Sequence, residues 1–221
     1  MKFRTVIFAF ISFTLFTCKS TINVNKKIVP KNVILLISDG TGLSQISSAF
    51  YFKESTPNYA RFKTLGMINT SSSRQDITDS AAGATAFACG VKTYNGAIGV
   101  ADDSTEVKNL VEVASLKNIK TGVIATSSIT HATPATFYAH VNNRGMKESI
   151  AEYLVPSSVD FFAGGGLKFF NKRKDKRNLV GELENNGFVM DTVGLAPRGT
   201  LTLDKRYGYL LAEDNSYNDP K

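Results

Sequence analysis

The aliphatic run VILLI at residues 33–37 constrains the fold of this chain more than any other segment. The run is continuous, rich in β-branched residues and ended by the turn residues Ser38-Asp39-Gly40. A short apolar run with such borders is typical of a strand that is buried on both faces of a parallel sheet. We therefore predict a buried strand over residues 33–37.

Further strand-like and helix-like segments alternate along the chain. Strand candidates cover residues 67–69, 121–125, 160–163 and 209–212, and helical composition is found over residues 43–53, 80–89, 105–117, 135–142 and 178–186. Such alternation indicates a layered α/β domain. The 221 residues, 43% hydrophobic and 20% charged, fit one globular domain with a sizeable core.

The first residues indicate export. Lys2 and Arg4 give a positive start, and an apolar or neutral run over residues 6–17 ends at Cys18. This run is shorter than the roughly 20 residues that span a bilayer. Residues 1–18 resemble a bacterial lipoprotein signal with lipidation at Cys18, although Thr17 stands where Gly, Ala or Ser is usual. The alternatives are an ordinary cleaved signal peptide or a buried strand. Either kind of signal leads us to expect an exported protein that is periplasmic or membrane-anchored.

The remaining compositional features are structural in our interpretation. Residues 19–31 are polar without a steady period, so we predict a tether there and a domain over residues 32–221. Cys89, the only other cysteine, is predicted to be a small buried side chain. The net charge of +7 owes much to the basic residues at 168–177. No aromatic or nucleic-acid motif accompanies them, so we predict a solvated loop and no nucleic-acid partner.

Asp39 is the first candidate for chemistry, because it directly follows the predicted strand. In open α/β sheets, ligands bind outside the carboxyl ends of strands. A carboxylate at that place can bridge hard cations through its two oxygens. The alternative is an Asp-Gly turn, in which the carboxylate bonds only local amides.

Asp79 and Ser80 form the second candidate, at the start of a helix of very small residues over 80–89. Free amides and the positive dipole end at a helix N-terminus attract anions such as phosphate. A serine hydroxyl is a weak nucleophile and needs a base or a metal, and the chain has only two histidines, His131 and His140. We therefore favour metal activation of Ser80, with simple helix capping by Asp79 as the alternative.

The third candidate follows the predicted strand at residues 121–125. Pro134 biases Thr133 toward an extended conformation, in which His131 and Thr133 point to the same side and can face one ion. Alternatively, Thr133 caps a helix opened by Pro134. The planar guanidinium of Arg144 can donate hydrogen bonds to two phosphate oxygens. Alternatively, Arg144 is a surface charge at a helix end. His140 is more simply a packed residue.

Taken together, five motifs resemble the alkaline phosphatase family in the correct order. They are VILLISDG at residues 33–40, DSAAGATA at 79–86, GVKTYNG at 90–96, HATPA at 131–135 and AHVNNR at 139–144. Several ordered motifs are far more specific than one. The resemblance covers roughly residues 32–170 and implies a three-layer α/β sandwich around a mostly parallel sheet.

The resemblance also implies roles for individual residues. Ser80 would form a phosphoserine, Arg144 would clamp phosphate and Asp79 would orient the site. Asp39 would bridge Zn²⁺ and Mg²⁺ with Ser80 at the zinc, and His131 and Thr133 would line the magnesium side. The implied activity is hydrolysis of phosphate monoesters, in a protein that could form a homodimer. Some family members carry aspartate where this chain has His131.

The later zinc ligands of the family have no counterpart here, because no histidine follows His140. We therefore expect an N-terminal portion of the fold with little activity by itself. A non-catalytic exported lipoprotein that binds phosphate or a metal is the alternative function. Sulfatases and phosphodiesterases of the wider superfamily fit less well, because they are expected to carry a modified cysteine or a threonine in place of Ser80.

Overall fold

The computed structural model describes residues 31–197 and 199–215, and the chain divides into two units, Met1–Ile37 and Ser38–Lys221. The predicted export signal, Cys18 and nearly all of the predicted tether lie outside the described residues. The described part of the first unit, residues 31–37, contains neither helix nor strand. The prediction of a buried strand at residues 33–37 is therefore wrong: Val33 and Ile34 are each 83% exposed.

The second unit contains a four-stranded sheet with strand order β1-β2-β4-β3, in which every neighbouring pair is parallel. The strands are β1 (Gly122–Ser128), β2 (Phe161–Gly165), β3 (Phe188–Asp191) and β4 (Arg206–Leu210). Three of the predicted strands are thus confirmed, with β4 beginning earlier than expected. Strand β3 was not predicted, and residues 67–69 form no strand, with Met67 and Ile68 exposed.

The helices agree with the sequence pattern in part. They are α1 (Leu43–Phe52), the 3-10 helix η1 (Asn58–Arg61), α2 (Ser80–Cys89), α3 (Leu110–Ser115), α4 (Ala132–Ala135), α5 (Lys147–Leu154), α6 (Lys168–Asn171) and α7 (Leu179–Asn185). The predictions near α1, α2 and α7 are confirmed, and α3 is shorter than predicted. The helix expected over residues 135–142 is wrong, because α4 ends where it was expected to begin. Helices α5 and α6 were not predicted.

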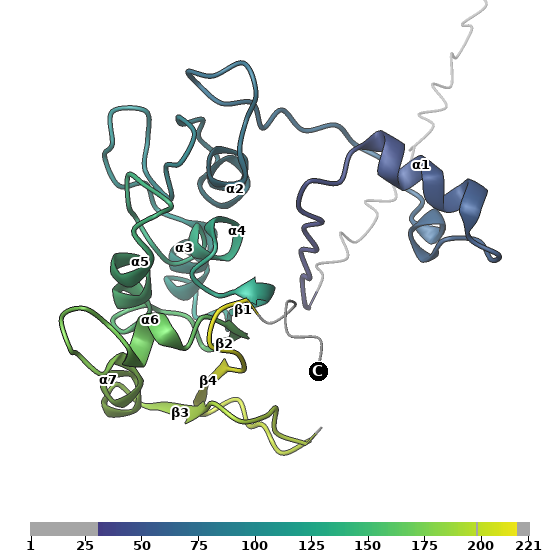
Figure 1. Cartoon of the computed structure of the whole chain (residues 1–221). Coiled ribbons are helices and arrows are strands. Elements are labelled where there is room, and N and C mark those ends of the chain that lie inside the picture. The colour runs from purple at the N-terminus through teal and green to yellow at the C-terminus, as the bar shows by residue number, and fades with distance from the viewer. Residues whose placement is uncertain (1–30, 198, 216–221) are drawn as a thin grey trace, which may run out of the picture. The chain divides into compact units, whose positions relative to one another are not determined.

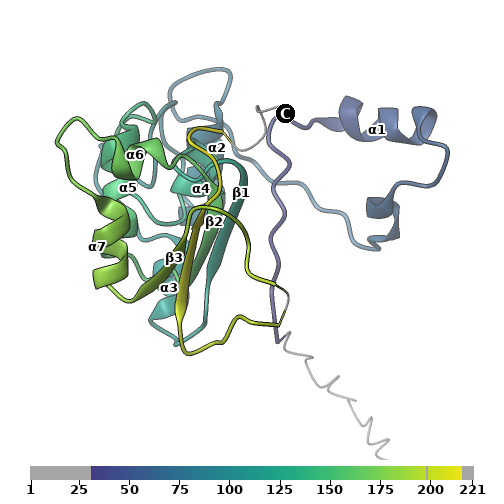
Figure 2. The ribbon, with the colours of Figure 1, turned by 60° about the horizontal axis from the view of Figure 1, so that its bottom comes forward.

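Helices cover one face of the sheet, as Figures 1 and 2 show for α5, α6 and α7. The main core lies between these layers and includes Val123 of β1, Phe162 of β2, Leu154 of α5 and Leu183 of α7, all buried. The α/β fold with a parallel sheet and flanking helices is confirmed. This arrangement gathers the carboxyl ends of β1, β2 and β4 along one edge, where His131 and Thr133 follow β1.

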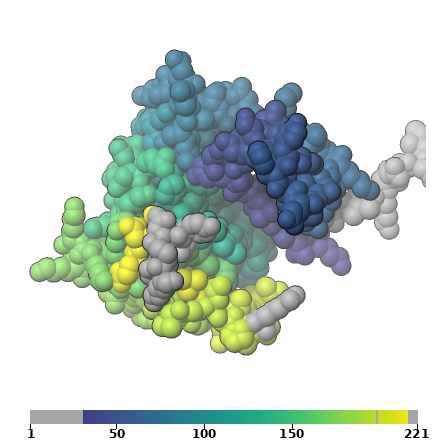
Figure 3. All heavy atoms as spheres, turned by 45° about the vertical axis from the view of Figure 1, so that its right-hand side comes forward, coloured from purple at the N-terminus to yellow at the C-terminus, as the bar shows by residue number. Residues whose placement is uncertain are grey.

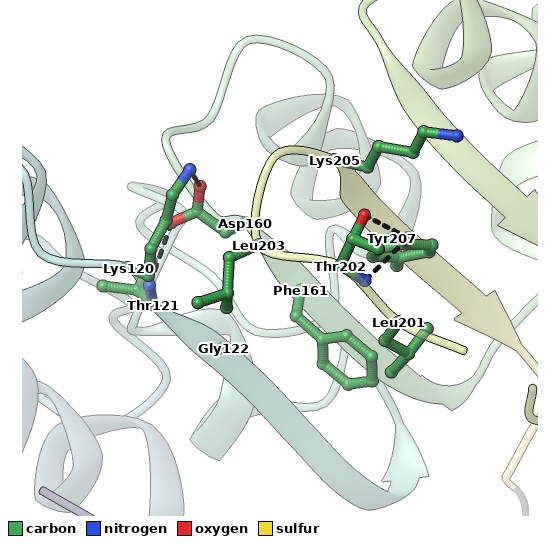
Figure 4. Close-up of a pocket in the computed structure, with 10 residues that line it drawn as sticks. All are labelled: Lys120, Thr121, Gly122, Asp160, Phe161, Leu201, Thr202, Leu203, Lys205 and Tyr207. Carbon is green, nitrogen blue, oxygen red and sulfur yellow. Dashed lines mark hydrogen bonds and ion pairs between the residues drawn. The ribbon is translucent and has the colours of Figure 1, made fainter. Parts of the chain in front are cut away.

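The opposite face of the sheet carries a smaller cluster of Ala163, Tyr207 and Tyr209, and Ile124 of β1 is 73% exposed there. At the amino ends of the strands lies a cavity of about 320 Å³, with Phe161, Leu201 and Leu203 in its lining and an ion pair of 2.8 Å between Lys120 and Asp160 at its rim (Figure 4). This cavity lies at the strand ends opposite to the predicted site.

The basic segment at residues 168–177 is a network of ion pairs. Arg173 has a side chain only 1% exposed, and it pairs with Glu152 of α5 and with Asp175. Lys168 pairs with Asp214 and Lys172 pairs with Glu213, in the segment after β4, which is yellow in Figure 3. These ion pairs join α5, α6 and the segment after β4. Residues 174–178 between α6 and α7 are exposed and form the solvated loop that the sequence predicts.

Cys89 is partly buried, and burial raises the pKa of its thiol to about 11. Within residues 31–197 and 199–215, no helix is both long and apolar enough to cross a bilayer.

Candidate active site

Ser80 is the first residue of α2, and the local sequence explains why the helix begins there. The Asp79 side chain caps the helix by accepting hydrogen bonds from the Ala81 and Ala82 amides, at 3.1 and 2.9 Å. The small residues that follow are mostly buried and let α2 pack against α4. Capping by Asp79 is thus confirmed. It also occupies the Ala81 and Ala82 amides, two of the amides that we expected to be free for an anion.

Asp39 lies between Ser80 and Thr133. Its Oδ1 accepts a hydrogen bond from Ser80 Oγ at 3.0 Å, and its Oδ2 accepts one from Thr133 Oγ1, also at 3.0 Å. Residues 38–41 do form a turn, through a bond of 3.3 Å from the Thr41 amide to the Ser38 carbonyl. Both carboxylate oxygens nevertheless bond distant hydroxyls, so Asp39 does more than complete its own turn.

Arg144 is held beside the start of α2 by two contacts. Its Nη1 donates to Asp79 Oδ2 at 3.0 Å, and its backbone amide donates to the Gly96 carbonyl at 2.7 Å. Burial of Asp79, which by itself would raise the pKa of the carboxyl, is outweighed by hydrogen bonds from Ala82, Arg144 and Gly96. The pKa of Asp79 therefore lies below its ordinary value, and the carboxylate is ionised at neutral pH.

His131 faces Arg144. Its Nε2 lies 3.4 Å from Arg144 Nη2, and because a guanidinium can only donate, Nε2 acts as the acceptor. Burial and the charges of Lys147 and Arg144 lower the pKa of the ring, against an opposing effect of Asp39. His131 is therefore neutral at pH 7, with its proton on Nδ1.

Thr133 differs from our expectation, since it is helical. It is the second residue of α4, and His131 is the N-cap of that helix. Pro134 is accommodated in the first turn, where its missing amide leaves no helical bond unmade. The prediction of an extended Thr133 is therefore wrong, and so is the alternative in which Thr133 caps the helix. His131 and Thr133 contact different partners, Arg144 and Asp39 respectively.

All six predicted site residues nevertheless come together. Hydrogen bonds and the adjacency of residues 79 and 80 join them in the order Thr133, Asp39, Ser80, Asp79, Arg144 and His131. His140 is not among them. Its Nδ1 lies 2.7 Å from the Gly99 carbonyl and its Nε2 lies 3.1 Å from Glu112, so it is a packed residue as predicted.

Lys147 adds a charge that the sequence pattern did not reveal. Its Nζ donates to the Thr130 carbonyl at 3.0 Å. Burial and the charge of Arg144 lower its pKa to about 8, although Asp214 acts in the opposite direction. At pH 7 the two cations Arg144 and Lys147 balance the carboxylates of Asp39 and Asp79.

The donor atoms around Asp39 fit a hard cation. One carboxylate and the hydroxyls of Ser80 and Thr133 supply oxygen ligands, which Mg²⁺ prefers. Zinc sites usually include nitrogen or sulfur, and Nε2 of His131 is engaged by Arg144. Over the described ranges there is no group of three or more His, Cys, Asp or Glu side chains that could hold a metal. These residues therefore fit magnesium better than zinc.

Two neighbours of the site, Asn95 and Gly96, were not predicted as site residues. The Gly96 amide donates to Asp79 Oδ2 at 3.1 Å, and the Asn95 side chain accepts from the Asp79 amide at 3.1 Å. An Asn-Gly pair signals a turn, and nothing in its local sequence shows which distant residues the turn contacts.

Comparison with known proteins supports the resemblance. The sequence model of the alkaline phosphatase family matches residues 30–195. The chain is 42% identical over 160 residues to an alkaline phosphatase of Schizosaccharomyces pombe, a match that covers 67% of this chain and 30% of that enzyme. For alkaline phosphatase of Escherichia coli the identity is 35% over 171 residues, covering 63% and 36%. The chain thus spans about a third of these curated relatives.

Solved structures give the same result. Alkaline phosphatase from the Antarctic bacterium TAB5 is 63% identical with a TM-score of 0.81, and the match covers 84% of this chain and 55% of that one. A variant of that enzyme, with one histidine replaced by aspartate, has magnesium bound in a site called M3. From the matched motifs, the parallel sheet and these comparisons, we conclude that the chain belongs to the alkaline phosphatase family.

Proposed function

We propose that this chain carries the nucleophile and phosphate-binding part of an enzyme that hydrolyses phosphate monoesters. The observation that carries the proposal is the placement of Ser80 between Asp39, which accepts its hydroxyl proton in a hydrogen bond, and the Asp79–Arg144 pair. Membership of the alkaline phosphatase family gives independent support. Because the chain spans only part of its relatives, the activity is proposed for the complete enzyme.

Arg144 is proposed to bind the phosphoryl oxygens. A guanidinium has five N–H donors, and Asp79 and His131 engage one on each of its two terminal nitrogens. The remaining donors can reach two phosphate oxygens in the bidentate geometry that arginine favours. Asp79 then has a positioning role, since it fixes the guanidinium without touching the substrate.

The chemistry proposed for Ser80 is a displacement in two stages. As the bond from Ser80 Oγ to phosphorus forms, the hydroxyl proton passes to Asp39 Oδ1 and the ester oxygen leaves with the electron pair of the broken bond. Asp39 passes this proton to the leaving ester oxygen, which departs as the alcohol. Water then attacks the phosphoserine and releases phosphate, and one of its protons goes to Ser80 Oγ, so that both side chains regain their starting states. When bound, Mg²⁺ and Zn²⁺ would neutralise charge on the phosphoryl group and lower the pKa of the serine hydroxyl.

The ligands proposed for magnesium are Asp39, Thr133 and His131, with the hydroxyl of Ser80 nearby. His131 would first have to give up its contact with Arg144. Magnesium in the M3 site of the TAB5 variant supports a magnesium site in this family. Zinc would share Asp39 and Ser80 with ligands from outside the described residues.

Trapping of the phosphoserine tests the proposal. The 221-residue chain is incubated with magnesium and zinc salts and an aryl phosphate, quenched in acid, digested and analysed by mass spectrometry. A single phosphorylation needs no turnover, so it is detectable in a very slow chain. A phosphoryl group on the Ser80 peptide, absent from Ser80→Ala and present in the control Ser104→Ala, is the expected result. Phosphate binding without phosphoserine would instead favour the non-catalytic binding protein.

We also propose that the protein is exported and anchored through a lipid on Cys18. The support is the charged and apolar pattern of residues 1–18. Mass spectrometry of the mature protein tests the anchor, because an unmodified Cys18 would exclude it.

A further inference from the structure

The side chain of Asn95 bridges two backbone groups of the loop that ends at Ser80. Its Oδ1 accepts a hydrogen bond from the Asp79 amide at 3.1 Å, and its Nδ2 donates to the Ile77 carbonyl at 2.7 Å. The side-chain amide of Asn95 thus bonds the loop backbone through one donor and one acceptor, as the backbone of a neighbouring strand would. The backbone amide of Asn95 is itself fixed, since it donates to Gln75 Oε1 at 2.9 Å.

The next residue, Gly96, connects the same turn to the phosphate-binding arginine. Its amide donates to Asp79 Oδ2 at 3.1 Å and its carbonyl accepts from the Arg144 amide at 2.7 Å. Its φ of 88° lies in the region that favours glycine. Residues 95–96 therefore contact both the start of the nucleophile helix and the arginine segment.

The side-chain pair alone would hold Arg144 only loosely. The side chains of Arg144 and Asp79 are 31% and 25% exposed, and ion pairs that are open to solvent hold their geometry weakly. The Ala81, Ala82 and Gly96 amides also hold the Asp79 carboxylate, and its orientation toward Arg144 further requires a fixed backbone at Asp79. The bond from the Asp79 amide to Asn95 Oδ1 supplies that restraint.

We propose that Asn95 is a positioning residue, which fixes the backbone at residues 77–79 so that Ser80 Oγ and the Arg144 guanidinium face the same phosphoryl group. This inference rests on the proposed function of Ser80 and Arg144. The role requires an amide, because the two bonds need a donor and an acceptor on one short side chain. In Asn95→Asp the acceptor for Asp79 remains, while a carboxylate oxygen replaces the donor to Ile77.

Hydrogen exchange measured by NMR on the 221-residue chain tests the restraint without any need for activity. Loss of one hydrogen bond shifts the equilibrium between the closed and open states of a segment roughly 10-fold, and an amide exchanges from the open state. In Asn95→Ala we expect exchange of the Asp79 amide to rise roughly 10-fold, and in Asn95→Asp to rise less. Tyr94→Phe is the matched control, because it removes a neighbouring hydroxyl whose hydrogen bond, at 2.9 Å, is to Ser104.

Two further readouts separate positioning from folding. Titration with inorganic phosphate and Mg²⁺ is expected to show affinity reduced roughly 3- to 10-fold in Asn95→Ala and unchanged in Tyr94→Phe. The NMR signal of Arg144 Nε should broaden in Asn95→Ala in the absence of phosphate. If Asn95→Ala does not fold, the same readouts on Asn95→Asp decide, because that variant keeps one of the two bonds.

The outcomes are distinguishable. Unchanged Asp79 exchange and an unchanged Arg144 signal would overturn the positioning role. Faster exchange with unaltered phosphate affinity would also overturn it, since the loop would then not direct binding. If the wild-type chain binds no phosphate, the proposed function fails for this chain. The exchange and Arg144 signals would then still show whether Asn95 orders the two groups.

Discussion

Removal of the Asp79 carboxylate should separate helix capping from the orientation of Arg144. Asp79 Oδ1 accepts the amides of Ala81 and Ala82, whereas Oδ2 accepts the Gly96 amide and Arg144 Nη1. In Asp79→Asn one oxygen can still cap α2, but an NH₂ group replaces the acceptor for Gly96 and Arg144. In Asp79→Ala both functions are lost.

The magnitudes follow from these contacts. Loss of an N-cap costs about 1 kcal/mol. The bond from Arg144 is an ion pair between partly exposed groups and is worth about 0.5 to 1 kcal/mol, and the Gly96 bond adds about 1 kcal/mol. We therefore expect Asp79→Asn to lower the free energy of unfolding by about 1 to 2 kcal/mol, and Asp79→Ala by about 2 to 3 kcal/mol.

Urea unfolding of the wild-type chain and both variants at pH 7 measures these differences. The folded-state pKa of Asp79 is depressed, so its contribution is present above the unfolded-state pKa and is lost as pH falls through the folded value. The difference between wild type and Asp79→Asn should therefore shrink in acid. A variant Asp79→Ala as stable as wild type, or a difference that does not change with pH, would refute this reasoning.

Three further predictions concern residues around the site. The folded pKa of Lys147, about 8 against an ordinary 10.5, means that the unfolded chain binds more protons between these values, so stability gains from this group as pH rises. The free energy of unfolding should therefore rise less between pH 7 and pH 10 in Lys147→Met than in the wild-type chain, by about 1 to 2 kcal/mol after allowance for solvent screening. An identical pH dependence in the variant and the wild type would contradict this prediction. Tyr138→Phe should destabilise the chain by about 1 to 2 kcal/mol in denaturant unfolding, because the buried hydroxyl donates to the Ile129 carbonyl at 2.8 Å, and a neutral substitution would show that this bond contributes nothing. Gly96→Ala should lower the free energy of unfolding by about 1 to 2 kcal/mol through its φ of 88° alone, since the new Cβ meets no atom within 4 Å. Gly99→Ala should prevent folding, because its Cβ would collide with the Ala139 carbonyl and lie 2.8 Å from His140 Nδ1. Circular dichroism of the two variants compares their folding, and equal effects would contradict the close packing around Gly99.

Local patterns predicted the elements whose causes are local. Helix α2 begins and ends as expected, because Asp79 caps it and Gly90 ends it with a φ of 72°. Strands β1 and β2 were recognised from apolar runs that do have parallel partners. The run at residues 33–37 is more apolar than either of these strands, yet it forms no strand. Composition reports the preference for a strand, whereas pairing depends on which backbone lies alongside.

The site residues were found through ordered motifs, and the structure brought them together. What the sequence could not supply was their contacts across long separations. Asn95 bonds the Asp79 amide and Lys147 bonds the Thr130 carbonyl, and neither spacing follows a helical or strand period. The error at Thr133 has a different cause. Proline disfavours a preceding helical residue on average, and here α4 begins early enough to place Pro134 in its first turn.

The central claim is that phosphate binds to both Ser80 and Arg144, on either side of Asp79. It is tested most directly by mapping the binding of inorganic phosphate to the isotope-labelled 221-residue chain by NMR in the presence of Mg²⁺. We predict that phosphate shifts the amide signals of residues 80–82 and the Arg144 Nε signal, and that Arg144→Ala weakens binding at least about 10-fold, in line with the loss of a bidentate charged contact. Shifts confined to the basic segment at residues 168–177, or binding unaffected by Arg144→Ala, would contradict the claim.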